Sequence, residues 1–366
     1  MTTQAWTPDR DEALRLLEEI SLTFGPSGCE DQVATLIEQQ ISPLCHSFVR
    51  DRMGNVIALC RYGKGTNQRR KVMVSAHMDE VGIMISEICD DGLCRFSTVG
   101  GIHRSVLEGR TVTLKGKQGL IQGVVASKAI HHKKKSEDYL LTPWDQLYLD
   151  LGVQDRTAAE ALVSVGDFGT FDSDFYLFGK NDSLVKGKAL DDRMGCAAMI
   201  LVMEQLKKAP LTEDLDVYFC FTVREEIGLS GAKVAAAKIA PDLAIVLETT
   251  AVGDVAEVEP SKEVANVGKG GVLSVMDRST IYDQDFLRFA LDIGRKENIP
   301  CQLKRYVSGG NDAGSIHKTG VGVRCLALSA PTRYLHSPAC VTSVADYLSI
   351  TALVYAMLKG ITPQTP

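Results

Sequence analysis

The sequence is poor in histidine, and its cysteines follow no pairing motif. There are seven histidines in 366 residues, and the ten cysteines form no Cys-x-x-Cys. The chain therefore gives no sign of a metal site built from paired thiolates. Most cysteines lie inside apolar runs, which predicts buried, reduced thiols in a cytoplasmic protein. Because histidines are few, each can be weighed as a candidate ligand.

The chain also lacks a basic excess, an export signal and a long uninterrupted apolar run. Its net charge of −6 argues against nucleic acid or an anionic membrane surface as the main partner. The first residues have no basic start followed by an apolar core, so we expect no export signal. The longest apolar stretch, residues 343–361, contains Asp346 and several hydroxyl side chains, which favours a packed helix over a membrane span.

Strand and helix patterns alternate through most of the chain, which predicts an α/β sheet with parallel members. Between about Glu80 and Gly179 the pattern changes to short strands, separated by glycine-containing turns, with almost no helical period. We therefore predict a mixed, mostly parallel sheet flanked by helices, formed by residues 1–79 and 180–366, with a small β-barrel domain inserted at residues 80–179. The expected strands of the sheet are 55–60, 71–76, 216–223, 243–248, 271–276 and 323–329, the main helices are 9–20, 30–40, 195–209, 230–239, 285–297 and 343–361, and the expected barrel strands include 94–99, 110–116 and 120–127.

Histidines and carboxylates gather where the predicted strands end. Each alone is more typical of a helix cap or a solvated charge. Together they lie at the carboxyl ends of strands or in adjoining loops, which is the edge where sites form in open α/β sheets. The set comprises His77 in "SAHMDE", Asp191 in "ALDDRMG", Glu225 and Glu226 in "VREEIG", Glu248 in "VLETT" and His336 in "RYLHSP".

Two histidines and three or four carboxylates can hold two divalent ions, and zinc, cobalt or manganese accept such nitrogen and oxygen ligands. A pair of ions about 3.5–4 Å apart needs a bridging carboxylate, for which Asp191 is the candidate. Asp79 lies on the same strand face as His77, so it can accept a hydrogen bond from the far ring nitrogen. Of Glu225 and Glu226, one can bind metal while the other acts as general base, and the residues alone leave that choice open.

Five motifs in this order resemble those of the tetrahedral (TET) metallo-aminopeptidases, a family that includes glutamyl and deblocking aminopeptidases and members once labelled cellulases. The motifs are "SAHMDEVG", "KALDDRMG", "REEIGLSGA", "GGNDAGSIH" and "RYLHSP". The resemblance implies that His77 and Glu248 bind one metal, that Glu226 and His336 bind the other, and that Asp191 bridges. It further implies Glu225 as general base, a cis peptide bond between Asp191 and Asp192, and a place for Asp312 near the substrate-binding wall. The glycine-rich turn at residues 308–317, which includes Gly310, either lets the backbone approach substrate closely or is a plain loop.

The same resemblance implies that the enzyme removes the N-terminal residue of short peptides, and that the inserted barrel is a dimerisation domain from which dimers build a hollow homododecamer. Many family members have an aspartate where this chain has Glu248. That difference bears on the metal preference of the site. The run His131 to Lys135 is typical of a solvated loop, and His317 has no ligand motif near it, so neither is assigned a role.

Three other functions fit part of the pattern. A glycosidase (endoglucanase) would use Glu225 or Glu226 with a second carboxylate, but it leaves both histidines unexplained. A co-catalytic metal carboxypeptidase or N-deacylase would share the ligand set and recognise a carboxylate or an acyl group. A metal-stabilised particle without activity would not need the candidate base.

Overall fold

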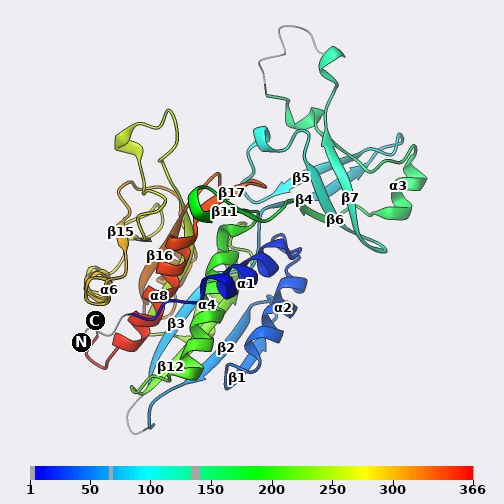
Figure 1. The fold of residues 1–366 in the computed structure, drawn as a ribbon. Helices are drawn as coiled ribbons and strands as arrows, with labels where there is room; N and C mark the ends of the chain where they lie inside the picture. The colour runs from blue at the N-terminus through cyan, green and yellow to red at the C-terminus, as the bar shows by residue number, and fades with distance from the viewer. Residues whose placement is uncertain (1–4, 66–68, 133–140, 366) are drawn as a thin grey trace.

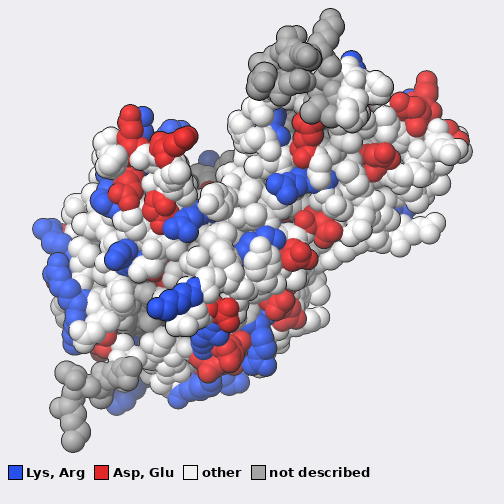
Figure 2. Space-filling view, turned by 45° about the horizontal axis from the view of Figure 1, so that its top comes forward, with Lys and Arg blue, Asp and Glu red and all other residues white. Residues whose placement is uncertain are grey.

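The computed structural model describes residues 5–65, 69–132 and 141–365, and it divides them into a large α/β part and a smaller barrel (Figure 1). Residues 133–135 of the charged run lie outside the described residues. No helix within the described ranges is long and apolar enough to cross a membrane. On the face shown in Figure 2, basic and acidic side chains both occur over the two parts, so neither sign dominates this face.

The α/β part is built on a mixed sheet with a parallel centre. Over the described residues its strands run in the order β1-β2-β12-β3-β13-β16-β17-β11-β10, and β14 and β15 join beside β16. The pairs β12 with β3, β3 with β13 and β13 with β16 are parallel, whereas the outer pairs along this order are antiparallel. The strands are β1 (Ser47–Arg50), β2 (Val56–Arg61), β3 (Arg70–His77), β10 (Tyr176–Phe178), β11 (Leu184–Gly187), β12 (Leu215–Thr222), β13 (Leu243–Ala251), β14 (Gly271–Leu273), β15 (Cys301–Leu303), β16 (Arg324–Arg333) and β17 (Cys340–Ser343).

Helices cover the sheet, because its central strands are apolar on both faces. Every residue of β3 from Val72 to His77 is buried, so both faces of this strand are covered. Helix α4 packs against β3 and β13 and also contacts α1 and α8 (Figure 1). The helices of this part are α1 (Arg10–Leu22), α2 (Asp31–Ile41), α4 (Leu190–Lys208), α5 (Ser230–Ile239), α6 (Gln284–Glu297), α7 (Ala313–Ile316) and α8 (Val344–Gly360).

Side-chain caps fix the starts of several helices. The Asp9 carboxylate accepts the backbone N–H groups of Asp11 and Glu12 at the start of α1. Asp283 does the same for α6, and Ser343 caps α8 by accepting the N–H of Asp346. Each cap satisfies N–H groups that have no partner within the helix, which explains why the helices begin close to the predicted positions.

The inserted segment closes into a barrel with the strand order β4-β5-β8-β7-β6-β9. These strands are β4 (Gly82–Ile88), β5 (Cys94–Val99), β6 (Thr111–Gly116), β7 (Gly119–Ala126), β8 (Tyr148–Asp150) and β9 (Phe168–Phe171). The predicted combination of a mixed α/β sheet with an inserted small barrel is confirmed. The exact domain limits, residues 79/80 and 179/180, stay a prediction.

Three local expectations were wrong. The barrel region contains a helix, α3 (Arg156–Leu162), capped by Asp155, which seven residues are too few to reveal as a helical period. Strand β13 continues three residues beyond Glu248, because Thr249 to Ala251 pair with Ala330 to Thr332 of β16. Strand β14 ends at Leu273 rather than at Met276.

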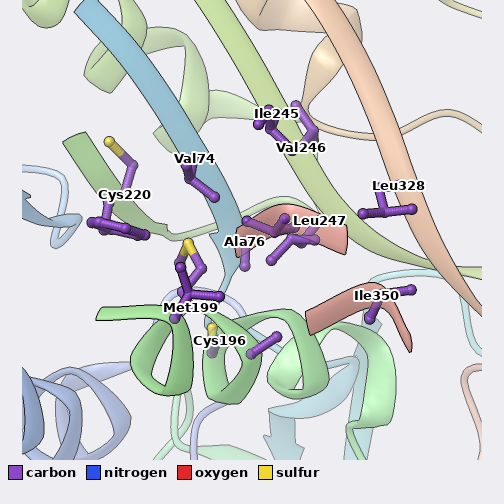
Figure 3. Packing of buried hydrophobic residues seen from close by; sticks show 14 of the residues in the cluster. Val74, Ala76, Cys196, Met199, Cys220, Ile245, Val246, Leu247, Leu328 and Ile350 are labelled. Atoms are coloured by element: carbon purple, nitrogen blue, oxygen red, sulfur yellow. The ribbon is translucent and has the colours of Figure 1, made fainter. Parts of the chain in front are cut away.

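The core of the α/β part depends on contacts between α4 and the central strands. Met199 and Cys196 of α4 face Val74 and Ala76 of β3 in Figure 3, and all four side chains are buried. Replacing Met199 by Ala leaves a cavity at this contact. We expect the free energy of unfolding to fall by about 2–4 kcal/mol, measured by urea denaturation. Met276→Ala is the control, because Met276 is 43% exposed and should change stability by less than about 0.5 kcal/mol.

Candidate metal centre

The parallel centre of the sheet brings the candidate ligands to one edge. His77 is the last residue of β3, Glu248 lies in β13, and Glu226 and His336 follow the ends of β12 and β16. Because these four strands are parallel neighbours, their carboxyl ends meet. Asp191 joins them from the first turn of α4, where its φ and ψ of −86° and 108° are not helical. The Asp191–Asp192 peptide bond is cis, as the family resemblance implied.

Two groups of side chains among the described residues are compact enough to hold a metal ion. One consists of His77, Asp191 and Glu248, and the other of Asp191, Glu226 and His336. In the first group, His77 Nε2 lies 3.4 Å from Asp191 Oδ1 and 3.5 Å from Glu248 Oε1. In the second, His336 Nε2 lies 3.4 Å from Asp191 Oδ2 and 3.3 Å from Glu226 Oε1. Asp191 therefore offers one oxygen to each group.

The ring orientations show that both groups fit a cation. His77 Nδ1 lies 3.0 Å from the Asp79 carbonyl oxygen, and His336 Nδ1 lies 2.8 Å from that of Gly101. A carbonyl oxygen only accepts, so Nδ1 carries the hydrogen in both rings, and in the neutral imidazole Nε2 presents a lone pair to carboxylate oxygens. These lone pairs repel one another unless a positive charge lies between them.

The distances agree with this reading. Charge-assisted N–H···O hydrogen bonds are about 2.7–2.9 Å long, so separations of 3.3–3.5 Å are long for direct ion pairs. Two ligands about 2.0–2.1 Å from a tetrahedral zinc ion are about 3.3–3.4 Å apart. In addition, Asp191 Oδ1 is buried and accepts no hydrogen bond from the described residues. The residues present thus fit a divalent metal in each group.

Electrostatics add to the same argument. Burial and the charge of Asp191 raise the pKa of Glu226 to about 7 and hold that of Glu248 well above its ordinary value. Burial alone would lower the pKa of His336, but Asp191 and Glu226 outweigh it and raise that pKa to about 9. Protons thus compensate the crowded negative charge when no metal is bound.

Asp79 holds the site together in a way the sequence did not predict. The closer acceptor for His77 Nδ1 is the backbone carbonyl of Asp79, because the nearest carboxylate oxygen, Oδ1, is 3.5 Å away. The buried carboxylate of Asp79 accepts the backbone N–H groups of Glu225 and Glu226 at 3.0 and 3.2 Å, and the hydroxyl of Ser27 at 2.5 Å. The expected hydrogen bond to the ring is therefore replaced by a contact with the turn that carries both glutamates.

The remaining candidate residues lie outside the two ligand groups. Glu225 is adjacent to Glu226 but belongs to neither group. Gly310 is exposed at the Gly-rich turn. Asp312 is only 1% exposed, and its Oδ2 accepts a 2.6 Å hydrogen bond from Thr222. Asp312 is therefore as buried as His77, and its place at the substrate-binding wall stays a prediction. His317 Nδ1 contacts the Ala313 carbonyl oxygen, away from both groups.

Two residues at the site, Ser27 and Gly101, were missed because they act through contacts with residues far away in the sequence. Ser27 lies in the breaker "FGPSGCE" between α1 and α2, and its N–H donates to the Glu80 carbonyl oxygen, which brings it beside Asp79. Gly101 contributes only a backbone carbonyl from the barrel. The Gly-Gly pair after β5 was the one available signal, since such pairs mark close backbone approaches.

The chain is similar to known aminopeptidases over most of its length. Residues 54–353 match the model of the M42 glutamyl aminopeptidase family. A putative aminopeptidase of Acetivibrio thermocellus is 37% identical over 338 residues, which cover 92% of this chain and 96% of that protein.

Solved structures give the same result. A TET aminopeptidase from a marine-sediment Thaumarchaeota archaeon superposes with a TM-score of 0.92 at 32% identity, covering 97% of this chain and 98% of that one. The TET1 peptidase of Pyrococcus horikoshii gives a TM-score of 0.84 at 32% identity, covering 94% and 98%.

The fold and the matches together define a peptidase, a hydrolase that acts on peptide bonds. More specifically, the chain belongs to the M42 glutamyl aminopeptidase family and is an aminopeptidase of the TET type. Its family uses divalent metal, in agreement with the two ligand groups.

Metal binding by the second group should depend strongly on pH. His336 ligates through Nε2 only when neutral, and its pKa of about 9 means that metal must displace a proton below that pH. We expect affinity to fall about tenfold per pH unit between pH 9 and pH 7, and more steeply below pH 7, where Glu226 also gains a proton. Zinc titration calorimetry at several pH values, in buffers of different ionisation enthalpy, measures the released protons. An affinity that is constant between pH 7 and pH 9 would contradict this.

Proposed function

We propose that this aminopeptidase is binuclear, with His77 and Glu248 holding one divalent ion, Glu226 and His336 holding the other, and Asp191 bridging them. The observation that carries the proposal is the set of four Nε2···O separations of 3.3–3.5 Å around the two carboxylate oxygens of Asp191. Zinc or cobalt, and also manganese, suit this nitrogen and oxygen ligand set.

Glu225 is the proposed general base. When bound, the two ions lower the pKa of an intervening water and stabilise the negative charge that develops on the substrate carbonyl oxygen. Burial, with the nearby charges of Asp312 and Glu226, raises the pKa of Glu225 well above its ordinary value, which suits a group that takes up a proton. The Glu225 carboxylate takes the proton of the attacking water and delivers it to the leaving amine as the C–N bond breaks.

The supporting residues keep this base in place. Asp79 accepts the N–H groups of Glu225 and Glu226, so one buried carboxylate orients the turn that carries both the base and a ligand. The exposed Gly310 is the proposed backbone contact for substrate. Asp312 is proposed to support the site through its hydrogen bond with Thr222, at the end of β12, and not through direct contact with the substrate.

The proposed substrates are short peptides with a free N-terminus, processed inside a homododecamer assembled from dimers through the barrel. The P. horikoshii TET1 peptidase can assemble into a tetrahedron or a large octahedral shell, and a dodecamer of a TET1 peptidase has been solved. A cytoplasmic location is supported by ten free cysteines, none of them exposed.

The rival functions differ in what they leave unexplained. A glycosidase needs two carboxylates but no histidines, whereas here both imidazoles face those carboxylates and are held there by carbonyl oxygens. A metal carboxypeptidase or N-deacylase shares the ligand groups and differs only in the substrate group it recognises. A metal-stabilised particle without activity would not need Glu225, whose carboxylate lies beside the two ligand groups and belongs to neither.

Replacing the proposed base should separate catalysis from metal binding. We expect Glu225→Gln to lower kcat for a peptide substrate by about 10²–10⁴-fold, because the amide cannot accept the water proton, while both ions still bind. Activity assays and zinc titration measure the two effects. Glu259→Gln is the matched control, since the Glu259 side chain is 66% exposed, and it should leave both values unchanged. Full activity of Glu225→Gln would exclude Glu225 as the base.

A substrate panel decides between aminopeptidase and deacylase activity. The metal-stripped protein is supplied with zinc, cobalt or manganese and given each peptide in free-amine and N-acetylated form. We expect metal-dependent release of the N-terminal residue from the free-amine peptides only. Cleavage of the acetylated forms, or release from the carboxyl end, would favour the deacylase or carboxypeptidase alternative.

A further inference from the structure

The two ligand groups differ in which part of the chain orients their histidine. His77 is oriented by the Asp79 carbonyl, two residues away on the same segment of the α/β part. His336 is oriented by the Gly101 carbonyl, 2.8 Å from its Nδ1. Gly101 follows β5, a barrel strand, and lies 235 residues earlier in the sequence than His336. The second group is therefore completed by the barrel.

Glu226 and His336 belong to the second group only, and the Gly100–Gly101 pair lies against both of them. A Cβ added at Gly100 would lie 3.2 Å from Glu226 Cβ and 2.9 Å from Val81 Cγ1. A Cβ added at Gly101 would lie 3.4 Å from His336 Nδ1. Gly100 also has a φ of +83°, which side-chain-bearing residues rarely adopt. Glycine at these positions lets the backbone approach Glu226 and His336 closely.

A buried polar cluster fixes the barrel in the position that this approach requires. Glu80 Oε2 accepts the hydroxyl of Thr170 in barrel strand β9, and Glu80 Oε1 accepts the ammonium of Lys188 in the α/β part, both at 2.7 Å. Arg193 of α4 lies 3.4 Å from the same Oε1. All four side chains are buried, so breaking the contact of Glu80 with Thr170 or with Lys188 would leave a buried polar group without that partner, and this resists reorientation of the barrel.

We infer that the Gly100–Gly101 pair of the barrel is a positioning element for the second metal ion: the Gly101 carbonyl fixes the ring of His336, and Gly100 leaves room for Glu226. The His336 side chain is 35% exposed, whereas that of His77 is 1% exposed, so His336 depends more on this hydrogen bond for its orientation. The partner of a metal-bound histidine typically contributes 10–100-fold to metal affinity. The inference rests on the proposed binuclear site.

The variant Gly100→Ala tests this on the full-length protein. The new methyl group would force the segment away from Val81 and Glu226, so we expect the second zinc ion to bind about 10–100-fold more weakly, while the first binds as in the wild type. Metal-binding isotherms from titration calorimetry on the metal-stripped protein give both constants without reference to activity. Such a split between the two constants would not arise from a general loss of stability.

Gly109→Ala is the matched control. Gly109 is also a barrel glycine, with a φ of +79°, but a Cβ added there would meet nothing within 4 Å among the described residues. The Gly109→Ala substitution imposes the same backbone strain but makes no contact like the one with Val81 and Glu226. The variant should therefore bind both ions like the wild type. If Gly100→Ala fails to fold, Gly101→Val replaces it. A Cβ at Gly101 would already touch the His336 ring, 3.4 Å from Nδ1, so the two further methyl groups of valine would crowd that ring and should weaken the same ion.

The outcomes separate the inference from the function on which it rests. Wild-type protein that binds fewer than two ions would overturn the binuclear site and, with it, this inference. Two ions in the wild type, with both bound equally well by Gly100→Ala, would overturn the positioning role alone. Equal weakening of both ions, or the same loss in Gly109→Ala, would also overturn it, because the effect would then not belong to the second group.

Discussion

The constraint on which the site depends is the concentration of negative charge in one buried volume. Asp191, Glu226 and Glu248 converge with two imidazole nitrogens whose lone pairs face them, and no residue of that set is cationic when the rings are neutral. Such a cluster is unfavourable without a positive charge, whether from protons or from metal. The fold imposes it nevertheless, since parallel strands β3, β12, β13 and β16 all end at that edge.

Backbone groups, rather than further side chains, do most of the orienting. Carbonyl oxygens of Asp79 and Gly101 set the two rings, and backbone N–H groups of Glu225 and Glu226 bind the Asp79 carboxylate. Backbone partners are fixed by the sheet and its turns, so they cannot rotate away as a long side chain can. One buried carboxylate thereby holds the loop that carries two adjacent glutamates.

The sequence predicted which side chains gather at the sheet edge better than it predicted their surroundings, for a physical reason. His77 and Glu248 are recognisable because an apolar strand that ends in a polar residue is a local pattern, and parallel strands bring such ends together. The contacts of Ser27 and Gly101 are long-range and leave no periodic trace, so only the folded chain reveals them. The assignment of Glu225 as base and Glu226 as ligand stays a prediction from the family resemblance, to which the structure adds that Glu226 belongs to one of the two groups and Glu225 to neither. Helix α3 was missed because its seven residues span only about two turns, which is too short to show a helical period in the sequence.

Glu248 shows how a longer side chain can serve at a position where the family resemblance implies an aspartate in many members. Its Oε1 accepts the backbone N–H of Thr249 at 2.9 Å and lies 3.5 Å from His77 Nε2. Glu248 is paired in register with Ser329 of β16, so its position along the edge is set by the strand, and the extra methylene must be accommodated by folding the carboxylate back. The Thr249 N–H provides that anchor. The longer side chain therefore still places an oxygen beside His77, within the first of the two groups that could hold a metal ion.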